Sequence, residues 1–329
     1  MCLEKQLKIL SVFLAILACA TQAASGAENW PGTKPLRFEV TAAAGGLPDI
    51  MARELSNYLS ASLGVPVGVE DRPGAGGNIA AGFVARAEPD GHLLLVTGSS
   101  QAVNPTLLPN PGFDYQRDLT PVSMAVNAKL LLVAAPAFPA KNITDVIRIA
   151  KQKPKSVSIA IPEIGTANHL AAEMLAQYGH IDLTFVPYGA APQAVPDLMA
   201  NRVDLEVANI SWALPQVRSG AVKALAVLSP QRSALAPDIP TSAEAGLPKM
   251  QIESWICIMT TGGTPAPIIA RLDQEFAKAL AQPEVRAAFA KQGVEIYYMG
   301  PRQLGDFIRS EAGRFAGLLA HSRLKAGSQ

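Results

Sequence analysis

A predicted strand that leads through a loop of small residues into an amphipathic helix constrains this chain most. In Leu36–Val40, apolar and polar residues alternate, as in a half-buried strand. From Ile50 to Leu63, apolar residues recur at helical spacing, which predicts a helix with one buried face. The segment Thr41–Asp49 joins them. Such a strand–loop–helix unit is the building block of an α/β fold.

The loop between this strand and helix has the composition of an anion-binding turn. Gly45 and Gly46 lack the Cβ atoms that keep a ligand away from the backbone. Pro48 and Asp49 suit the first turn of a helix, whose backbone N–H groups have no intrahelical partners. We expect the loop to hold a carboxylate; a tight turn without a ligand is the alternative.

The N-terminus has the pattern of a secretory signal peptide. Lysines precede an apolar run at 9–20, which is too short to span a bilayer, and small residues follow it. We therefore assign 1–27 to a signal peptide and expect a periplasmic protein. Cleavage after Ala23 or Ala27 would leave a soluble chain, and a lipid anchor on Cys19 is the less favoured alternative.

Length and charge narrow the remaining possibilities. At 329 residues, the chain is longer than one typical core supports, so two domains are expected. A formal net charge of +1 does not suggest a protein that binds nucleic acid. Two of the three cysteines lie in the leader, which leaves Cys257 without an internal disulfide partner; we expect a buried, inert thiol.

Predicted strands and helices alternate along the chain in two series. The strands read as continuous apolar segments, which predicts parallel sheets with helices on both faces. A proline-rich connection at 105–121 precedes the second series, and Thr144 is the expected cap of its first helix. The expected domains are 28–132 with 250–329, and 133–249. Two crossings between them would form a hinge.

The order and spacing of short motifs resembles the Bug-type periplasmic solute-binding proteins of tripartite tricarboxylate transporters. The resemblance extends over essentially the whole mature chain. Its landmarks are Trp30–Leu36, Gly45–Gly46, Asp49–Ile50, Asp71–Asn78, Glu88–Gly91, Asn104–Pro105, Val186–Tyr188, Val203–Asp204, Pro240–Thr241, Glu244–Gly246, Ser254–Trp255 and Gly263–Pro267.

This resemblance implies a two-lobed type II periplasmic-binding-protein fold whose hinge consists of two crossovers. It implies no enzyme and no cofactor, but a receptor that delivers a small organic acid or amino-acid-like ligand to membrane permease subunits; we expect a monomer. In the family, two loops hold the ligand carboxylates, and the matching segments here are Thr41–Asp49 and Ile161–Asn168. Backbone donors can bind an anion in this way without a full countercharge.

We predict a ligand site from these loops and from polar or aromatic residues near the ends of other predicted strands. Tyr188 of this set, and Trp255 outside it, could line an apolar ligand body, with core packing as the alternative role for either. Local turn bonding is the alternative for Asn104 and Asn209. The candidates are Gly45, Gly46, Asp49, Ser99, Asn104, Gly165, Thr166, Asn168, Tyr188 and Asn209.

Several residues depart from the family pattern. Leu47 and Pro48 replace the usual glycine and hydroxyl residue of the first loop, and Ala208 replaces a frequent aspartate. In the second loop, Pro162 removes a donor and Glu163 adds negative charge. A monocarboxylate, an aromatic acid and a ligand with a positive group therefore remain open.

Two other functions compete with the receptor. The first is a hydrolase or lyase on the same scaffold, but the sequence contains no nucleophile-elbow motif that would support it. His169 and Glu173 are spaced for one helix face, but no further cluster of histidine or cysteine accompanies them, so we predict no metal site. A ligand-sensing partner of a signalling receptor would use the same cleft.

Overall fold

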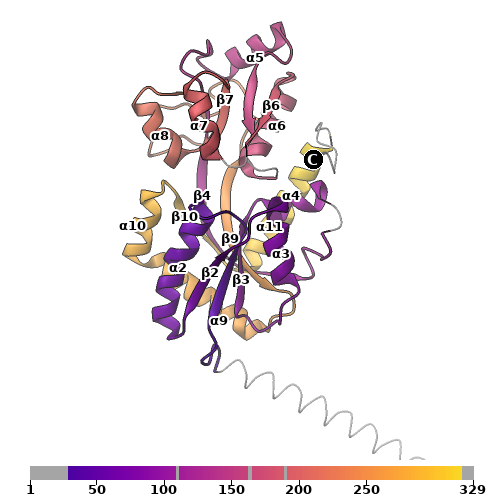
Figure 1. Cartoon of the computed structure of the whole chain (residues 1–329), viewed down its shortest axis with the longest axis vertical. Coiled ribbons are helices and arrows are strands. Elements are labelled where there is room, and N and C mark those ends of the chain that lie inside the picture. The colour runs from indigo at the N-terminus through magenta and orange to yellow at the C-terminus, as the bar shows by residue number, and fades with distance from the viewer. Residues whose placement is uncertain (1–28, 109–110, 162–164, 189–190, 321–329) are drawn as a thin grey trace, which may run out of the picture.

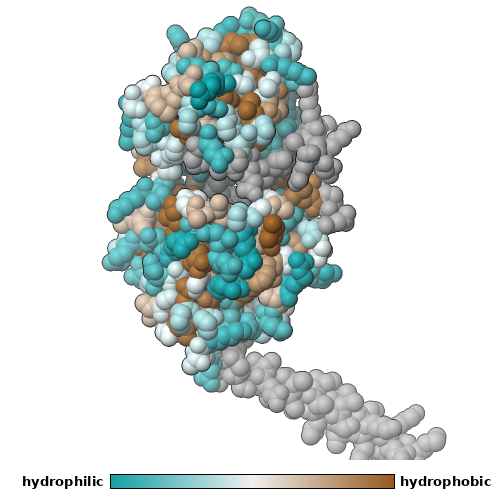
Figure 2. All heavy atoms as spheres, viewed as in Figure 1, coloured by the Kyte–Doolittle hydropathy of each residue, from teal (hydrophilic) through white to brown (hydrophobic). Residues whose placement is uncertain are grey.

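In a computed structural model, the chain forms two α/β lobes that meet at a narrow waist (Figures 1 and 2). The structure describes residues 29–108, 111–161, 165–188 and 191–320. The predicted signal peptide and residues Pro162 and Glu163 lie outside them. Hydrophilic residues cover most of the face that Figure 2 shows.

The first lobe contains a mixed sheet with helices on both faces (Figure 1). Its strands run in the order β2-β1-β3-β9-β4, with β10 also paired to β4. The strands are β1 (Leu36–Val40), β2 (Val67–Asp71), β3 (Leu93–Gly98), β4 (Leu119–Ala134), β9 (Glu253–Thr261) and β10 (Glu295–Met299). The helices are α2 (Leu47–Leu63), α3 (Asn78–Ala85), α4 (Ser100–Leu107), α9 (Ala266–Ala281), α10 (Pro283–Lys291) and α11 (Pro301–Leu319), with a short 3₁₀ turn, η1, at Ala75–Gly77.

The second lobe continues the sheet beyond β4. Its strands follow in the order β4-β7-β5-β6, and β8 pairs with β4. They are β5 (Ser158–Ile161), β6 (Thr184–Pro187), β7 (Leu205–Asn209) and β8 (Lys223–Val227). The helices are α5 (Ile143–Gln152), α6 (Ala167–Gly179), α7 (Ala191–Met199) and α8 (Ile210–Arg218).

The two lobes are joined through β4 and β9. Strand β4 changes partners along its length: Lys129 pairs with Glu253 of β9, whereas Leu130 pairs with Asn209 of β7. One long strand therefore belongs to both lobes. The chain returns to the first lobe through β9, and both strands pass through the waist in Figure 1. This architecture confirms the predicted two-lobed fold.

Strand direction corrects one expectation. The pairs β1–β2, β1–β3, β5–β6 and β5–β7 are parallel, as predicted. The pairs β3–β9, β4–β9 and β4–β7 are antiparallel. The central strands of each lobe are buried on both faces in either direction, so apolar composition could not distinguish the two arrangements.

The opening strand–loop–helix unit folds as predicted. Met51, Leu55 and Leu59 are fully buried on the inner face of α2. Gly64 ends the helix in the left-handed region, at φ 70°, where glycine carries no Cβ penalty. The Phe38 ring of β1 lies 6.2 Å from that of Phe276 on α9, which places α2 and α9 over one hydrophobic core.

Two local predictions were wrong, and helix α8 was missed. The expected proline-rich connection at 105–121 contains the end of α4, with Pro105 inside it, and the start of β4. Packing of α4 against α11 compensates for the hydrogen bond that a helical proline loses. The cap of α5 is Asn142, whose side chain accepts from the Asp145 amide at 2.9 Å, and not Thr144. Helix α8 was not predicted, because it follows β7 without a loop and contains Pro215.

Candidate ligand-binding site

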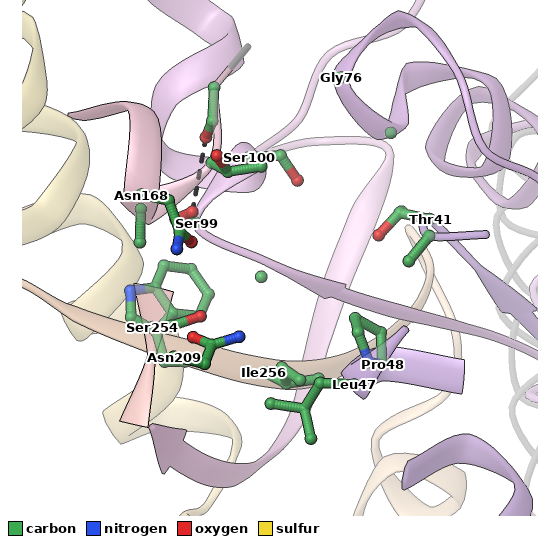
Figure 3. A pocket seen from close by; sticks show the side chains of 17 residues that line it. Thr41, Leu47, Pro48, Gly76, Ser99, Ser100, Asn168, Asn209, Ser254 and Ile256 are labelled. Carbon is green, nitrogen blue, oxygen red and sulfur yellow. Dashed lines mark hydrogen bonds between the residues drawn. The ribbon is translucent and has the colours of Figure 1, made fainter. Parts of the chain in front are cut away.

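A cavity of about 190 Å³ lies between the lobes (Figure 3). This volume is below the roughly 300–1,000 Å³ typical of sites for drug-sized ligands, so it suits a small metabolite. Its wall combines residues of both lobes, including part of β9. They are Thr41, Ala42, Leu47, Pro48, Gly76, Gly77, Gly98, Ser99, Ser100, Gly165, Thr166, Ala167, Asn168, Asn209, Ser254, Trp255 and Ile256.

Helix starts make up much of this wall. Leu47 opens α2, Ser100 opens α4 and Ala167 opens α6, while Gly77 and Asn209 are the N-cap residues of α3 and α8. The first N–H groups of a helix have no intrahelical acceptors, and the N-terminal end of the helix dipole is positive. Helices from both lobes therefore direct their positive ends toward one small space, which is the electrostatic environment that an anion requires.

Two backbone N–H groups of the first-lobe loop form hydrogen bonds within the loop and the helix start that follows it. The Gly45 N–H donates to the Asp49 carboxylate at 2.8 Å, and the Gly46 N–H donates to the Ala43 carbonyl at 3.1 Å. The Asp49 carboxylate also pairs with Arg53 at 2.6 Å. The structure does not bring Gly45, Gly46 or Asp49 to the cavity wall. In this loop, the chain's own carboxylate occupies the donor that we expected to hold a ligand.

The second-lobe loop does reach the cavity. Gly165, Thr166 and Asn168 line it, as predicted for this loop. The Thr166 hydroxyl accepts from the amide of His169 at 3.3 Å and caps α6. The Asn168 Nδ2 donates to the Val207 carbonyl at 2.6 Å, which ties the first turn of α6 to β7. The amide and hydroxyl groups of this wall are therefore held in place before a ligand binds.

His169 supports the second-lobe loop from behind. Its Nδ1 accepts from the Gly165 N–H at 3.1 Å. The side chain is buried, and this desolvation lowers the pKa of His169 to about 4. The ring is therefore neutral at physiological pH and can accept this hydrogen bond. Gly165 has φ +84°, a conformation that favours glycine, and a Cβ atom at this position would lie only 3.0 Å from Asn104 Oδ1 of the first lobe.

Ser99 connects the two lobes, whereas Asn104 acts within the first lobe. The Ser99 hydroxyl donates to the Gly165 carbonyl of the second lobe, over a long 3.5 Å, and Ser99 lines the cavity. Asn104 is fully buried behind the wall, where its Nδ2 donates to the Gly76 carbonyl and to Asn78 Oδ1, both at 2.8 Å. Asn104 therefore positions the glycine turn before α3.

Of the remaining candidates, Asn209 lines the cavity and Tyr188 does not. Asn209 lines the cavity, and its buried Oδ1 has no hydrogen-bond partner among the described residues. Tyr188 is not among the lining residues; its hydroxyl donates to the Asp197 carboxylate at 2.8 Å. The structure therefore brings Ser99, Gly165, Thr166, Asn168 and Asn209 together and leaves Tyr188 outside.

The sequence prediction missed part of the wall. Ser100 follows a predicted candidate, and Gly76 and Gly77 belong to a glycine-rich turn that we interpreted as mainly structural. Their position directly before a predicted helix was the available signal. Trp255, in contrast, was an aromatic candidate from the sequence; it lines the cavity and packs edge-on against Phe307 at 5.3 Å between ring centroids. Its Nε1 is buried and has no acceptor within the described parts of the chain.

The chemistry of the wall is that of a binding site for a small anion. Its described lining residues include no Lys, Arg, His, Asp or Glu. Hydroxyl, amide and backbone groups must therefore supply the polar contacts, together with the helix starts. Cys257 is buried nearby on β9, and burial raises the pKa of its thiol. Across the described residues, no group of His, Cys, Asp or Glu is arranged to hold a metal ion.

Comparison with known proteins places the chain in a family. The model of the "Tripartite tricarboxylate transporter family receptor" matches residues 51–324. The chain belongs to this family. Protein BugT of Bordetella pertussis is 34% identical to this receptor over 325 residues, which cover 98% of this chain and 99% of BugT.

Solved structures agree with this assignment. The periplasmic binding protein BugD matches the receptor with a TM-score of 0.79 at 31% identity, over 88% of this chain and 98% of BugD. MatC from Rhodopseudomonas palustris, solved with bound malate, matches with a TM-score of 0.79 at 30% identity, over 88% of this chain and 100% of MatC. The receptor is therefore a Bug-type solute-binding protein, which confirms the predicted family.

Proposed function

We propose that this receptor captures a small carboxylate-bearing solute in the cavity between its lobes and delivers it to a permease of the tripartite tricarboxylate transporter type. The observation that carries the proposal is the convergence of the starts of α2, α4, α6 and α8 on one uncharged cavity. Aligned helix dipoles and preoriented donors stabilise an anion there.

The position of the cavity supports a mechanism by closure. Its walls come from both lobes, so a ligand that contacts both walls favours the closed arrangement over an open one. The closed lobes then present a surface that a permease can distinguish from the open form. The bound malate of the related MatC supports the choice of a small organic acid.

The proposal includes export to the periplasm through the N-terminal segment 1–27. The family consists of transporter receptors, and its related BugD is a periplasmic binding protein. None of the helices in the described residues combines the length and apolar character needed to cross a bilayer. Fractionation of cells that express the full chain tests this part, with recovery in the periplasmic fraction expected.

Thermal-shift screening against organic acids tests ligand capture. A ligand at about 100 times its dissociation constant stabilises a protein by roughly 2.7 kcal/mol, which is a readily measured shift. Ala42→Phe is expected to abolish the shift, because Ala42 lines the cavity and a phenyl ring would fill it. Ala43→Phe is the matched control, because the neighbouring Ala43 is exposed and lies outside the cavity wall.

The outcomes separate binding in the cavity from other effects. A shift that persists in Ala42→Phe would move the ligand out of this cavity. If no acid shifts the unfolding temperature of the wild-type receptor, the proposed function fails. If chromatography shows that a bound acid is converted to a product, the protein is instead an enzyme. Loss of signalling with intact uptake in a deletion strain would favour a sensor.

A further inference from the structure

The helices that begin at the cavity differ in the charge of their first turns. Helix α2 carries Asp49 there, and its carboxylate already accepts from the Gly45 N–H. Helices α3, α4, α6 and α8 have no acidic residue in the first turn. A carboxylate at a helix start compensates its positive end. The positive ends of α4, α6 and α8 therefore remain available to a ligand anion, whereas that of α2 is compensated.

The side chains at these helix starts also differ in polarity. Figure 3 shows Ser99, Ser100 and Asn168 on one side of the cavity and Leu47, Pro48 and Ile256 on the other. Ser99 and Ser100 belong to the start of α4, and Asn168 belongs to the start of α6. This polar side of the cavity thus coincides with two of the uncompensated helix ends, the starts of α4 and α6, whereas Asn209 at the start of α8 lies beside Ile256 in Figure 3.

The opposite side is mainly aliphatic, although Figure 3 also places Thr41 toward Pro48 and Asn209 beside Ile256. The Thr41 hydroxyl already donates to the Val96 carbonyl at 3.2 Å. Pro48 has no N–H, and it occupies the first turn of α2, where a donor would otherwise face the cavity. Leu47 packs against the first-lobe core cluster that contains Ile256. A ligand group placed here meets aliphatic surface, and the positive end of α2, which would attract a second carboxylate, is already compensated by Asp49. Burying a second ligand carboxylate without donors is costly.

On this basis we propose that the ligand is an amphipathic monocarboxylate, with its acid group at the starts of α4 and α6 and its apolar body against Leu47, Pro48 and Ile256. This inference rests on the proposed function and goes beyond it, because it excludes dicarboxylates as preferred ligands. The malate of MatC has two carboxylates, so the two related receptors would differ in the wall formed by the start of α2.

Calorimetric titration of the mature receptor with three matched probes tests the inference. Hexanoate has one acid group, adipate adds a second at the other end of a chain of the same length, and hexanamide removes the charge. We expect hexanoate to bind at least tenfold more tightly than adipate and hexanamide. Adipate binding as tightly as hexanoate would overturn the monocarboxylate inference and leave the proposed function standing. Equal binding of hexanamide and hexanoate would overturn both, because the site would then not recognise a carboxylate. No binding of either acid would overturn the monocarboxylate inference, and the thermal-shift screen would then decide the proposed function.

A pair of isosteric variants tests the part assigned to Asp49. Asp49→Asn keeps an acceptor for Gly45 but removes the negative charge at the start of α2, so the affinity ratio of adipate to hexanoate should rise at least threefold. Asp145→Asn is the control, because Asp145 occupies the first turn of α5, away from the cavity wall. An unchanged ratio in Asp49→Asn, or an equal rise in both variants, would overturn the role of this charge. The ratio is independent of the folded fraction of either preparation.

Discussion

The backbone N–H of Gly45 donates to the carboxylate of Asp49 at 2.8 Å, so the loop before α2 is closed by a side chain of the helix that it precedes. Asp49 is 3% exposed and also pairs with Arg53. Desolvation raises the pKa of nearby Asp71, and the negative charge of Asp49 raises it further. One buried carboxylate therefore holds the loop, compensates a helix dipole and affects a neighbouring acid.

Removal of this carboxylate should destabilise the first lobe. Asp49→Ala breaks the bond to Gly45 and removes a favourable charge at a helix start, so we expect a loss of about 1–2 kcal/mol in the free energy of unfolding. The pKa of Asp71 should fall toward its ordinary value in the same variant. Urea unfolding and NMR titration measure the two effects. A stable variant with an unchanged Asp71 pKa would contradict the role of this contact.

The buried His169 should make the receptor less stable in acid. Its folded pKa of about 4 lies below its unfolded value of 6.5, so the unfolded state binds a proton first as the pH falls. This contribution to stability is complete above pH 6.5 and is lost between pH 6.5 and 4, by at most about 1.4 kcal/mol per pH unit. His169→Asn keeps an acceptor near Gly165 without titrating. The stability difference between wild type and variant, measured by urea unfolding, should follow this pH window.

Glu206 should have the opposite pH dependence. This carboxyl group of β7 is buried, both of its oxygens are without partners in the described residues, and desolvation raises its pKa to about 8. The unfolded state releases the proton first as the pH rises through 4.5, so stability is lost between pH 4.5 and 8. Glu206→Gln should gain stability relative to wild type across that window. Equal pH profiles of the two proteins in urea unfolding would show that Glu206 does not titrate in this way.

Gly98 should tolerate no side chain. A Cβ atom at this position would lie 2.6 Å from the backbone carbonyl oxygen of Trp255, which is held in the paired strand β9. We expect Gly98→Ala to cost about 1–3 kcal/mol, as overpacking does in cores. Gly313→Ala is the control: the position is exposed on α11, an added Cβ would meet open space among the described residues, and the variant should gain roughly 0.5–1 kcal/mol. Thermal unfolding of both variants measures the contrast.

The two glycine-containing loops show which features of the site local sequence patterns could predict. The second-lobe candidates Gly165, Thr166 and Asn168 reach the cavity because their loop ends a strand and begins a helix, an arrangement that residue patterns reveal. Gly45 and Gly46 have the same pattern, but their N–H groups are engaged within the loop. Helix periodicity cannot show whether an acid in the first turn bends back to its own loop.

The sequence by itself determined most of the strands and helices but not α4 and α8, together with the end of α2 at Gly64 and the expectation of two lobes, because these depend on periodicity and turn residues over a few positions. Only the tertiary structure decided which residues share the cavity. Ser99 meets Gly165 across 66 positions, and β9 brings Trp255 beside both. Such contacts depend on how β4 and β9 join the lobes, and no local pattern encodes that geometry.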